Sequence, residues 1–264
     1  MSRFTNNLSF GRTLVATNLK ASLALRGAFA AQVLFMMLNN FTFFVFWWVL
    51  MQRTPSLRGW RLADIQVLFG VVAAGYGVTV TLAGGVRYLG QAIEDGMLDT
   101  LLTQPKPVLL HALGLRLQPS GFGDVLSGLL FVFSSGQVSW RSAPVVALAI
   151  IASAVVFLAC GIVLFSLAFW VGRVETAARQ VWELLLTFSL YPEPLFGGTL
   201  RLALFTVLPA GFVGYLPARV VRAASVQDVA MLVIGAVVYL AVAIQVFERG
   251  LRRYASGSRF STFG

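Results

Sequence analysis

Long apolar runs constrain this sequence more than any other feature. A helix needs roughly 20 apolar residues to cross the hydrocarbon core of a bilayer. The runs that reach about this length are residues 28–51, 62–84, 119–138, 144–171, 181–198 and 226–247. A soluble core of this size could not bury them, because 58% of the residues are hydrophobic and only 11% are charged. The sequence therefore predicts an all-α membrane protein with six transmembrane helices.

One transmembrane domain, residues 28–248, is expected between two basic ends. Residues 1–27 carry several basic side chains and lack the cleavage pattern of a signal peptide, which predicts an uncleaved first span. Residues 249–264 are predicted to form a basic cytoplasmic tail.

A helical stripe runs through the N-terminal segment. Its members are Leu8, Val15, Leu19 and Leu23, which recur at spacings of seven, four and four residues. This spacing predicts an amphipathic helix that lies at the membrane surface. The alternative is a disordered basic tail attracted to anionic headgroups.

Basic residues predict the orientation of the chain. With six spans and both termini in the cytoplasm, 13 Lys and Arg residues lie inside and seven lie outside. That excess agrees with the positive-inside rule. A seventh span would reduce the difference to 11 against nine, so six spans are favoured.

Residues 199–217 are apolar but contain several helix breakers. These are Pro209, Gly211, Gly214 and Pro217. Broken backbone is tolerated at membrane depth where it is buried in protein or lines a water-filled cavity. We therefore expect a re-entrant hairpin that enters from the outer face before the last helix. A kinked spanning helix is the alternative, because Gly and Pro are frequent in membrane helices.

An acidic segment separates the second run from the third. Three of the ten acidic residues, Glu94, Asp95 and Asp99, lie here together. The apolar residues that recur at helical spacing are Val86, Leu89, Ile93, Met97 and Leu101. This pattern predicts a short amphipathic helix at the membrane surface, broken in two at Gly96. Because the segment faces water between two spans, it is expected to dock a soluble partner.

Several chemical classes are excluded by absent motifs. The two lysines, Lys20 and Lys106, do not follow a glycine, so no phosphate-binding P-loop can be written. His111 is the single histidine and Cys160 the single cysteine, which argues against a zinc site or a disulfide. The sequence predicts no catalytic residue, no metal site, no cofactor bound by this chain and no nucleic-acid partner.

Polar residues interrupt two of the apolar runs. Asn39 and Asn40 could line a substrate path or make hydrogen bonds between packed helices, and both interpretations stay open. Glu183 lies near Arg179 and Arg173, which predicts an ion pair at the membrane interface.

Two stretches resemble a known family. Residues 94–105 contain the pattern G-x-L-D-x-L-L-x-x-P, and residues 191–218 contain a run rich in Pro, Gly and aromatic residues. Together they resemble ABC-2-type transporter permeases, the membrane subunits of ABC exporters. The resemblance implies that residues 87–102 form a coupling helix seated in a partner ATPase. It also implies that residues 8–23 brace this helix and that residues 200–216 contribute to an outer gate.

The resemblance assigns candidate site residues. Within the coupling loop, residues 86–118, those expected at the ATPase are Arg87, Gln91, Glu94, Asp95, Gly96 and Asp99. Those expected at the gate are Phe205, Pro209, Gly211, Phe212 and Tyr215.

The implied assembly is a permease paired with a second permease, identical or different, and with two ABC ATPase subunits that bind ATP and Mg²⁺. The expected location is the inner membrane of a bacterial cell. The expected cargo is a hydrophobic or amphipathic compound, such as a drug-like molecule or a lipid. A passive channel or scaffold and a lipid-modifying membrane enzyme are the alternatives.

Overall fold

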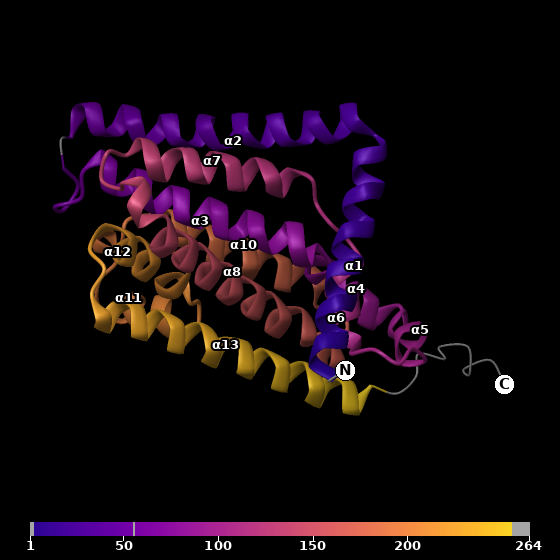
Figure 1. Ribbon diagram of the computed structural model, residues 1–264. Helices are drawn as coiled ribbons and strands as arrows, with labels where there is room; N and C mark the ends of the chain where they lie inside the picture. The colour runs from indigo at the N-terminus through magenta and orange to yellow at the C-terminus, as the bar shows by residue number, and fades with distance from the viewer. Residues whose placement is uncertain (1–2, 55, 255–264) are drawn as a thin grey trace.

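The computed structural model describes residues 3–54 and 56–254, and this part of the chain is helical without a β-strand. The long helices are α1 (Arg3–Ala24), α2 (Arg26–Arg53), α3 (Leu62–Ala83), α7 (Ser120–Ser134), α8 (Ala143–Ser166), α10 (Glu175–Leu190) and α13 (Val226–Arg253). Figure 1 shows α1 running across one end of a bundle formed by the other long helices, at a steep angle to them. The predicted all-α class is confirmed.

Shorter elements connect these helices. After α3 come the 3-10 turn η1 (Gly84–Tyr88), α4 (Leu89–Glu94), α5 (Leu98–Leu102) and α6 (Val108–Gly114). The short helix α9 (Ala168–Val171) follows α8. Between α10 and α13 lie α11 (Gly198–Thr206), the π-helical turn η4 (Gly211–Tyr215) and α12 (Leu216–Arg222). Single 3-10 turns occur at η2 (Trp140–Ser142) and η3 (Glu193–Leu195).

In the residues that the structure describes, four helical stretches are long and apolar enough to cross a membrane. They are Arg26–Arg53, Leu62–Glu94, Trp140–Val171 and Val226–Arg253. A fifth candidate is the pair of α11 with residues Gly211–Arg222, which is bent by 72°. These stretches match the runs predicted at 28–51, 62–84, 144–171 and 226–247.

The other two predicted spans are shorter helices than expected. Helix α7 has 15 residues and ends at Ser134, close to a turn in which Gly136 takes a φ of 72°. Helix α10 has 16 residues and ends at Leu190. The next residue, Tyr191, is extended because it precedes Pro192, and a proline restricts the residue before it to extended conformations. The boundaries predicted at 138 and 198 are therefore wrong.

The helices pack in one continuous series. Helix α2 packs on α7, α7 on α3, α3 on α8, and α8 on α13, while α10 packs on α8 and α3 (Figure 1). Small residues allow α3 and α7 to approach closely. A Cβ atom at Gly70 would lie 2.6 Å from the backbone oxygen of Gly128, and one at Gly77 would lie 2.5 Å from that of Gly121. Close backbone approach through small residues is typical of helix packing in membranes.

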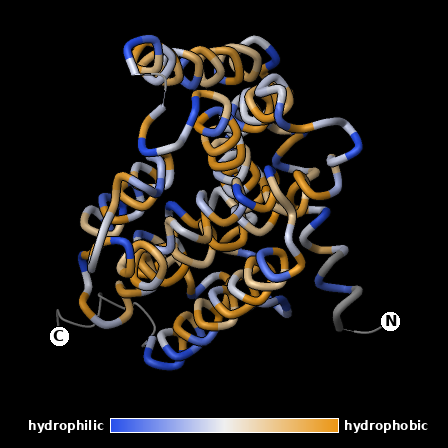
Figure 2. Tube along the Cα trace, turned by 90° about the vertical axis from the view of Figure 1, so that its left-hand side faces the viewer, coloured by the Kyte–Doolittle hydropathy of each residue, from blue (hydrophilic) through white to orange (hydrophobic). Residues whose placement is uncertain are grey.

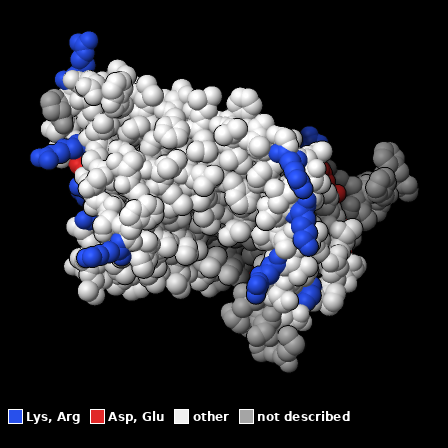
Figure 3. All heavy atoms as spheres, turned by 45° about the horizontal axis from the view of Figure 1, so that its top comes forward, with Lys and Arg blue, Asp and Glu red and all other residues white. Residues whose placement is uncertain are grey.

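The outer surface of the bundle is apolar. Only 17% of the apolar stretch of α2, and the same share in α13, is buried. Phe35 on α2 is 70% exposed and Ile234 on α13 is 62% exposed. Hydrophobic residues lie on the outer sides of the helices as well as between them (Figure 2). Lys and Arg side chains gather at the two ends of the molecule and leave an uncharged band between them (Figure 3). Lipid is the solvent that suits such a band.

We name the two ends after the predicted orientation. The outer end holds the loops after α2, α7, α10 and α12. There Arg58 donates to the backbone oxygen of Pro194 at 2.7 Å, and Arg222 pairs with Asp64 at 2.8 Å. The inner end holds α4, α5, α6, the start of α10 and the end of α13. Loops that were predicted on one side of the membrane therefore contact one another.

Candidate functional site

The acidic segment at the inner end folds as two short helices at an angle. Gly96 adopts a φ of 75°, a conformation that strains residues with a Cβ atom, and it separates α4 from α5. The predicted break at Gly96 is confirmed. The turn also shifts the helical register, so Leu98 is fully buried and Met97 is 44% exposed. Met97 therefore does not share the buried face of Leu89, Ile93 and Leu101, the residues with which its spacing groups it.

Arg87 points into the bundle from the base of this segment. Its guanidinium donates to the hydroxyl oxygen of Tyr76 at 3.4 Å and to the side-chain oxygen of Gln118 at 3.3 Å. It also lies 6.0 Å from the centre of the Trp182 ring. Arg87 thus links the segment to α3, to the start of α7 and to α10.

Glu94 makes a second link from the segment to the bundle. Its carboxylate accepts a hydrogen bond of 3.0 Å from the backbone amide of Val174, the residue before α10. Amides at a helix N-terminus lack partners within the helix and favour negative charge. Glu94 and Arg87 therefore face the bundle, away from the free surface where an ATPase contact was expected.

The free surface of the segment is formed by other side chains, which we call the docking tip. Its members, all exposed, are Gln91, Asp95, Met97, Thr100 and Leu102. Leu102 is 46% exposed. Asp99 and Gly96 are half-buried. The docking tip therefore combines an acidic side chain with two exposed apolar ones.

Helix α1 packs beside the segment through α6. The rings of Phe10 and His111 are 5.2 Å apart, and Asn18 donates to the backbone oxygen of Gly114 at 2.6 Å. Residues 3–24 form the helix that was predicted there. The stripe residues Val15 and Leu19 are half-buried, whereas the side chain of Leu8 lies outside the described part. Its position at a membrane surface stays a prediction.

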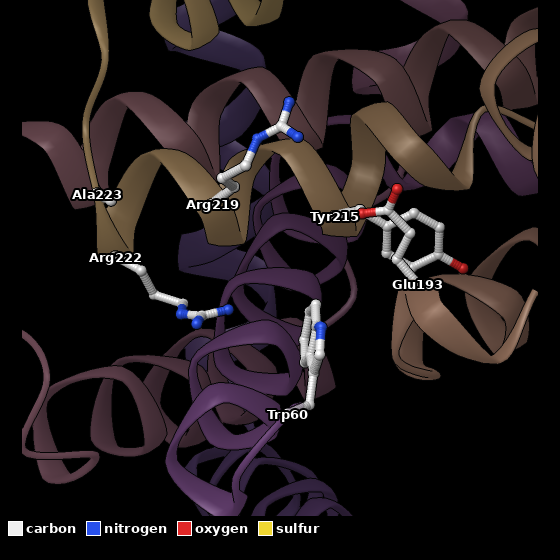
Figure 4. A pocket seen from close by; sticks show the side chains of 6 residues that line it. All are labelled: Trp60, Glu193, Tyr215, Arg219, Arg222 and Ala223. Atoms are coloured by element: carbon white, nitrogen blue, oxygen red, sulfur yellow. The ribbon is translucent and has the colours of Figure 1, made fainter. Parts of the chain in front are cut away.

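At the outer end, α11 and α12 form a bent pair held by ion pairs at both ends. Arg201 pairs with Glu193 at 2.6 Å, and Arg219 pairs with Asp228 at 2.8 Å. Arg222, which binds Asp64, also lies 5.3 Å from the Trp60 ring. These contacts surround a pocket of about 240 Å³ (Figure 4). The residues that line it are Trp60, Glu193, Tyr215, Arg219, Arg222 and Ala223.

The predicted gate residues lie in the bend of this pair. The ring of Phe212 lies 6.1 Å from that of Phe205 and 5.4 Å from that of Tyr239 on α13. The Tyr215 hydroxyl donates to the backbone oxygen of Phe188 on α10 at 2.6 Å.

Two of the predicted gate residues are buried where the backbone itself is closely packed. Pro209 and Gly211 are both buried, and a Cβ atom at Gly211 would lie 2.3 Å from the Phe205 ring. The structure thus brings the five predicted gate residues together between α10 and α13. Whether they control passage stays a prediction.

Asn40 lies in a buried polar cluster between α2 and α7. Its amide donates to Asp124 and to Ser127, both at 2.8 Å. The interpretation that Asn40 links packed helices therefore fits the structure. Asn39 is exposed on the other side of α2. The sequence marked Asn40 as unusual, but only the packing of α2 on α7 identifies Asp124 as its partner.

Glu183 differs from its expected role. Arg179 pairs with Glu175, one turn earlier on α10, and Glu183 is exposed. Glu183 lies at the middle of α10, whose bounds are Glu175–Leu190. The predicted ion pair with Arg179 is therefore wrong. If α10 crosses the membrane, Glu183 needs a protein or water neighbour, because lipid cannot solvate a carboxylate.

Apolar helices with exposed apolar faces define a multi-pass membrane protein. A family model described as ABC-2 family transporter protein matches residues 37–258, and the chain belongs to this family. Members are membrane subunits for transport that associate with ABC ATPases. No curated protein and no solved structure matches the chain. In the described part of the chain, no group of three or more His, Cys, Asp or Glu side chains could hold a metal ion.

Proposed function

We propose that this chain is the permease subunit of an ATP-driven ABC exporter. The cargo would be a hydrophobic or amphipathic compound, a drug-like molecule or a lipid, that leaves the cytoplasm or the inner leaflet. The docking tip is the observation that carries the proposal. Its exposed acidic and apolar side chains extend from a segment that Arg87 and Glu94 anchor to the bundle. A water-facing surface of this composition suits a protein partner.

The proposed mechanism is mechanical. Two partner ATPases would bind ATP and Mg²⁺, and their closure would push on the docking tip. Glu94 would pass this movement to α10 and Arg87 would pass it to α3, because these are the helices that the two side chains contact. Tilting of packed helices between two arrangements opens a cavity to alternate sides.

A second permease would complete the transport path. The exposed Glu183 at the centre of α10 supports this inference, since a neighbouring chain or an aqueous cavity must cover it. The second permease would be the same chain or a related one.

We infer six spans and a re-entrant hairpin in the inner membrane of a bacterial cell, with cytoplasmic termini. The short helices α7 and α10 would be the third and fifth spans, because they lie beside α3 and run between the same two ends (Figure 1). For the hairpin, Arg201 near its start and Arg222 at its end both form ion pairs with residues of the outer end. A hairpin that enters and leaves at one face has this arrangement.

The proposal is tested by changing the docking tip alone. Asp95→Lys combined with Met97→Ser should lower capture of the partner ATPase by at least about tenfold, equal to about 1.4 kcal/mol. Transport should fall in parallel. Arg141→Glu, an exposed charge reversal at the outer end, is the matched control. If the double variant captures ATPase and transports like the parent protein, the docking tip is not the coupling surface.

A further inference from the structure

A large groove opens at the inner end between α1 and α13. Its volume is about 1090 Å³, slightly above the usual range of about 300–1,000 Å³ for ligand sites. Helix α1 packs against α6, whereas α13 packs against α8, so the two walls of the groove are supported by different helices. Residues of α6 and α8 form the floor. The groove is separate from the docking tip and from the outer pocket.

The groove is lined almost entirely by apolar side chains. Leu14 and Leu19 come from α1, Leu113 from α6, and Leu240 and Ile244 from α13. Ile244 is 37% exposed, so the groove continues into the lipid-facing surface of α13. A groove of this composition at membrane depth is suited to hydrocarbon chains and not to water.

Charged groups of opposite sign lie on the two walls. Arg12 on α1 and Glu248 on α13 both line the groove. Among the described residues, Asn7 is the only other lining residue with a polar side-chain group. Both charged side chains are exposed, and no ion pair joins them among the described residues. The groove therefore offers one cation and one anion beside a large apolar surface.

We propose that this groove binds one phospholipid of the inner leaflet, with an aminophospholipid such as phosphatidylethanolamine as the preferred class. The acyl chains would fill the apolar part. Arg12 would donate to the phosphate, for which a guanidinium has suitable geometry. Glu248 would accept from the ammonium group, which phosphatidylglycerol lacks. The bound lipid would join α1 to α13, and this does not depend on ATPase coupling.

Photo-labelling in nanodiscs tests the site directly. The full complex is placed in nanodiscs that contain phosphatidylethanolamine with a diazirine in one acyl chain, and labelled peptides are mapped. Label should concentrate on residues 107–114 and on the groove side of α13. Ile244→Trp should lower this label by about fivefold, equal to about 1 kcal/mol. Val242 lies on the side of α13 away from the groove and is 48% exposed, so Val242→Trp should leave the label unchanged.

Charge variants test the headgroup assignment without filling the groove. Native mass spectrometry measures how much phosphatidylethanolamine and how much phosphatidylglycerol stay bound to the purified complex. Glu248→Gln should reduce the ratio of phosphatidylethanolamine to phosphatidylglycerol by about two- to fivefold, the range expected for exposed charge pairs. Arg12→Gln should lower retention of both lipids, whereas Lys20→Gln, outside the groove, should lower neither.

Three results would overturn the proposal. One is label in the groove that Ile244→Trp does not reduce. Another is a lipid ratio that stays constant in Glu248→Gln. The third is a peptide of the second permease found cross-linked in the groove, which would make this face a protein interface. None of these results would bear on the docking tip, because ATPase capture is measured separately.

Discussion

The carboxylate of Glu94 accepts a hydrogen bond from the backbone amide of Val174 across 3.0 Å. This bond joins the acidic segment after α3 to the residue that precedes α10, 80 residues further along the chain. Glu94, which was predicted to contact a partner ATPase, thus contacts the protein's own backbone, while its neighbour Asp95 remains exposed.

Loss of this bond should destabilise the protein and weaken coupling. We expect Glu94→Ala to lower the free energy of unfolding by about 0.5–2 kcal/mol, the range for lost helix caps. Glu94→Gln keeps an acceptor oxygen and should lose less. Thermal unfolding and cargo moved per ATP are measured on the same complex. Asp95→Asn, which removes charge without this contact, should keep the parent stability; equal losses in all three variants would contradict the assignment.

The close approach of α3 and α7 predicts a strong effect of one methyl group. A Cβ atom at Gly128 would lie 2.5 Å from the backbone oxygen of Gly70. Gly128→Ala should therefore destabilise the protein by about 1–3 kcal/mol, as overpacked sites do. A Cβ atom at Gly27 would meet nothing within 4 Å, so Gly27→Ala is the control. Melting temperatures in detergent check both; a Gly128→Ala protein as stable as the parent would show that the helices are further apart.

The buried cluster between α2 and α7 predicts coupled mutations. Asn40→Leu should leave Asp124 without its amide donor and cost about 1–3 kcal/mol. Asp124→Leu made together with Asn40→Leu should recover part of this loss, because both polar groups are then removed. A double-mutant cycle on unfolding free energies measures the coupling, expected at about 0.6–2 kcal/mol. Asn39→Leu, at an exposed site, should change stability little.

Phe212 separates the gate hypothesis from simple packing. Its ring contacts Tyr239 and Phe205, so Phe212→Ala should cost about 3–5 kcal/mol if the site cannot collapse. If Phe212 also closes the outer path, the variant should raise basal leak or change cargo selectivity per folded molecule. Transport and thermal stability are compared on one purified sample. Lower stability with an unchanged cargo profile would leave packing as the role of Phe212.

Cysteine labelling tests the orientation and the hairpin in a Cys160→Ala background. Cysteine at Ser56 and at Ala224 should react with an impermeant reagent in intact cells, because both exposed positions lie at the outer end. Cysteine at Thr103, exposed beside the docking tip, should be protected. Labelling at Ser56 without labelling at Ala224 would mean that residues 199–217 cross the membrane.

The sequence by itself determined that lipid surrounds this protein and that its secondary-structure elements are helices. Apolar runs at 28–51, 62–84, 144–171 and 226–247 became long helices, because only a helix satisfies its own backbone hydrogen bonds in lipid. The break at Gly96 could also be predicted, since glycine is the residue that accepts a positive φ without strain. These properties depend on the local sequence and on the medium around the chain, and not on contacts between distant segments.

Tertiary structure alone decided which polar side chains face inward. Charge and spacing placed Glu94 and Asp95 on one predicted surface, and the family resemblance added Arg87. Arg87 and Glu94 instead contact α3 and the start of α10, and of the three only Asp95 is exposed. Asn40 likewise gained its role from Asp124, 84 residues away. Such partners are chosen by how helices pack against one another, and a hydrogen bond between distant segments leaves no periodic signal in the sequence.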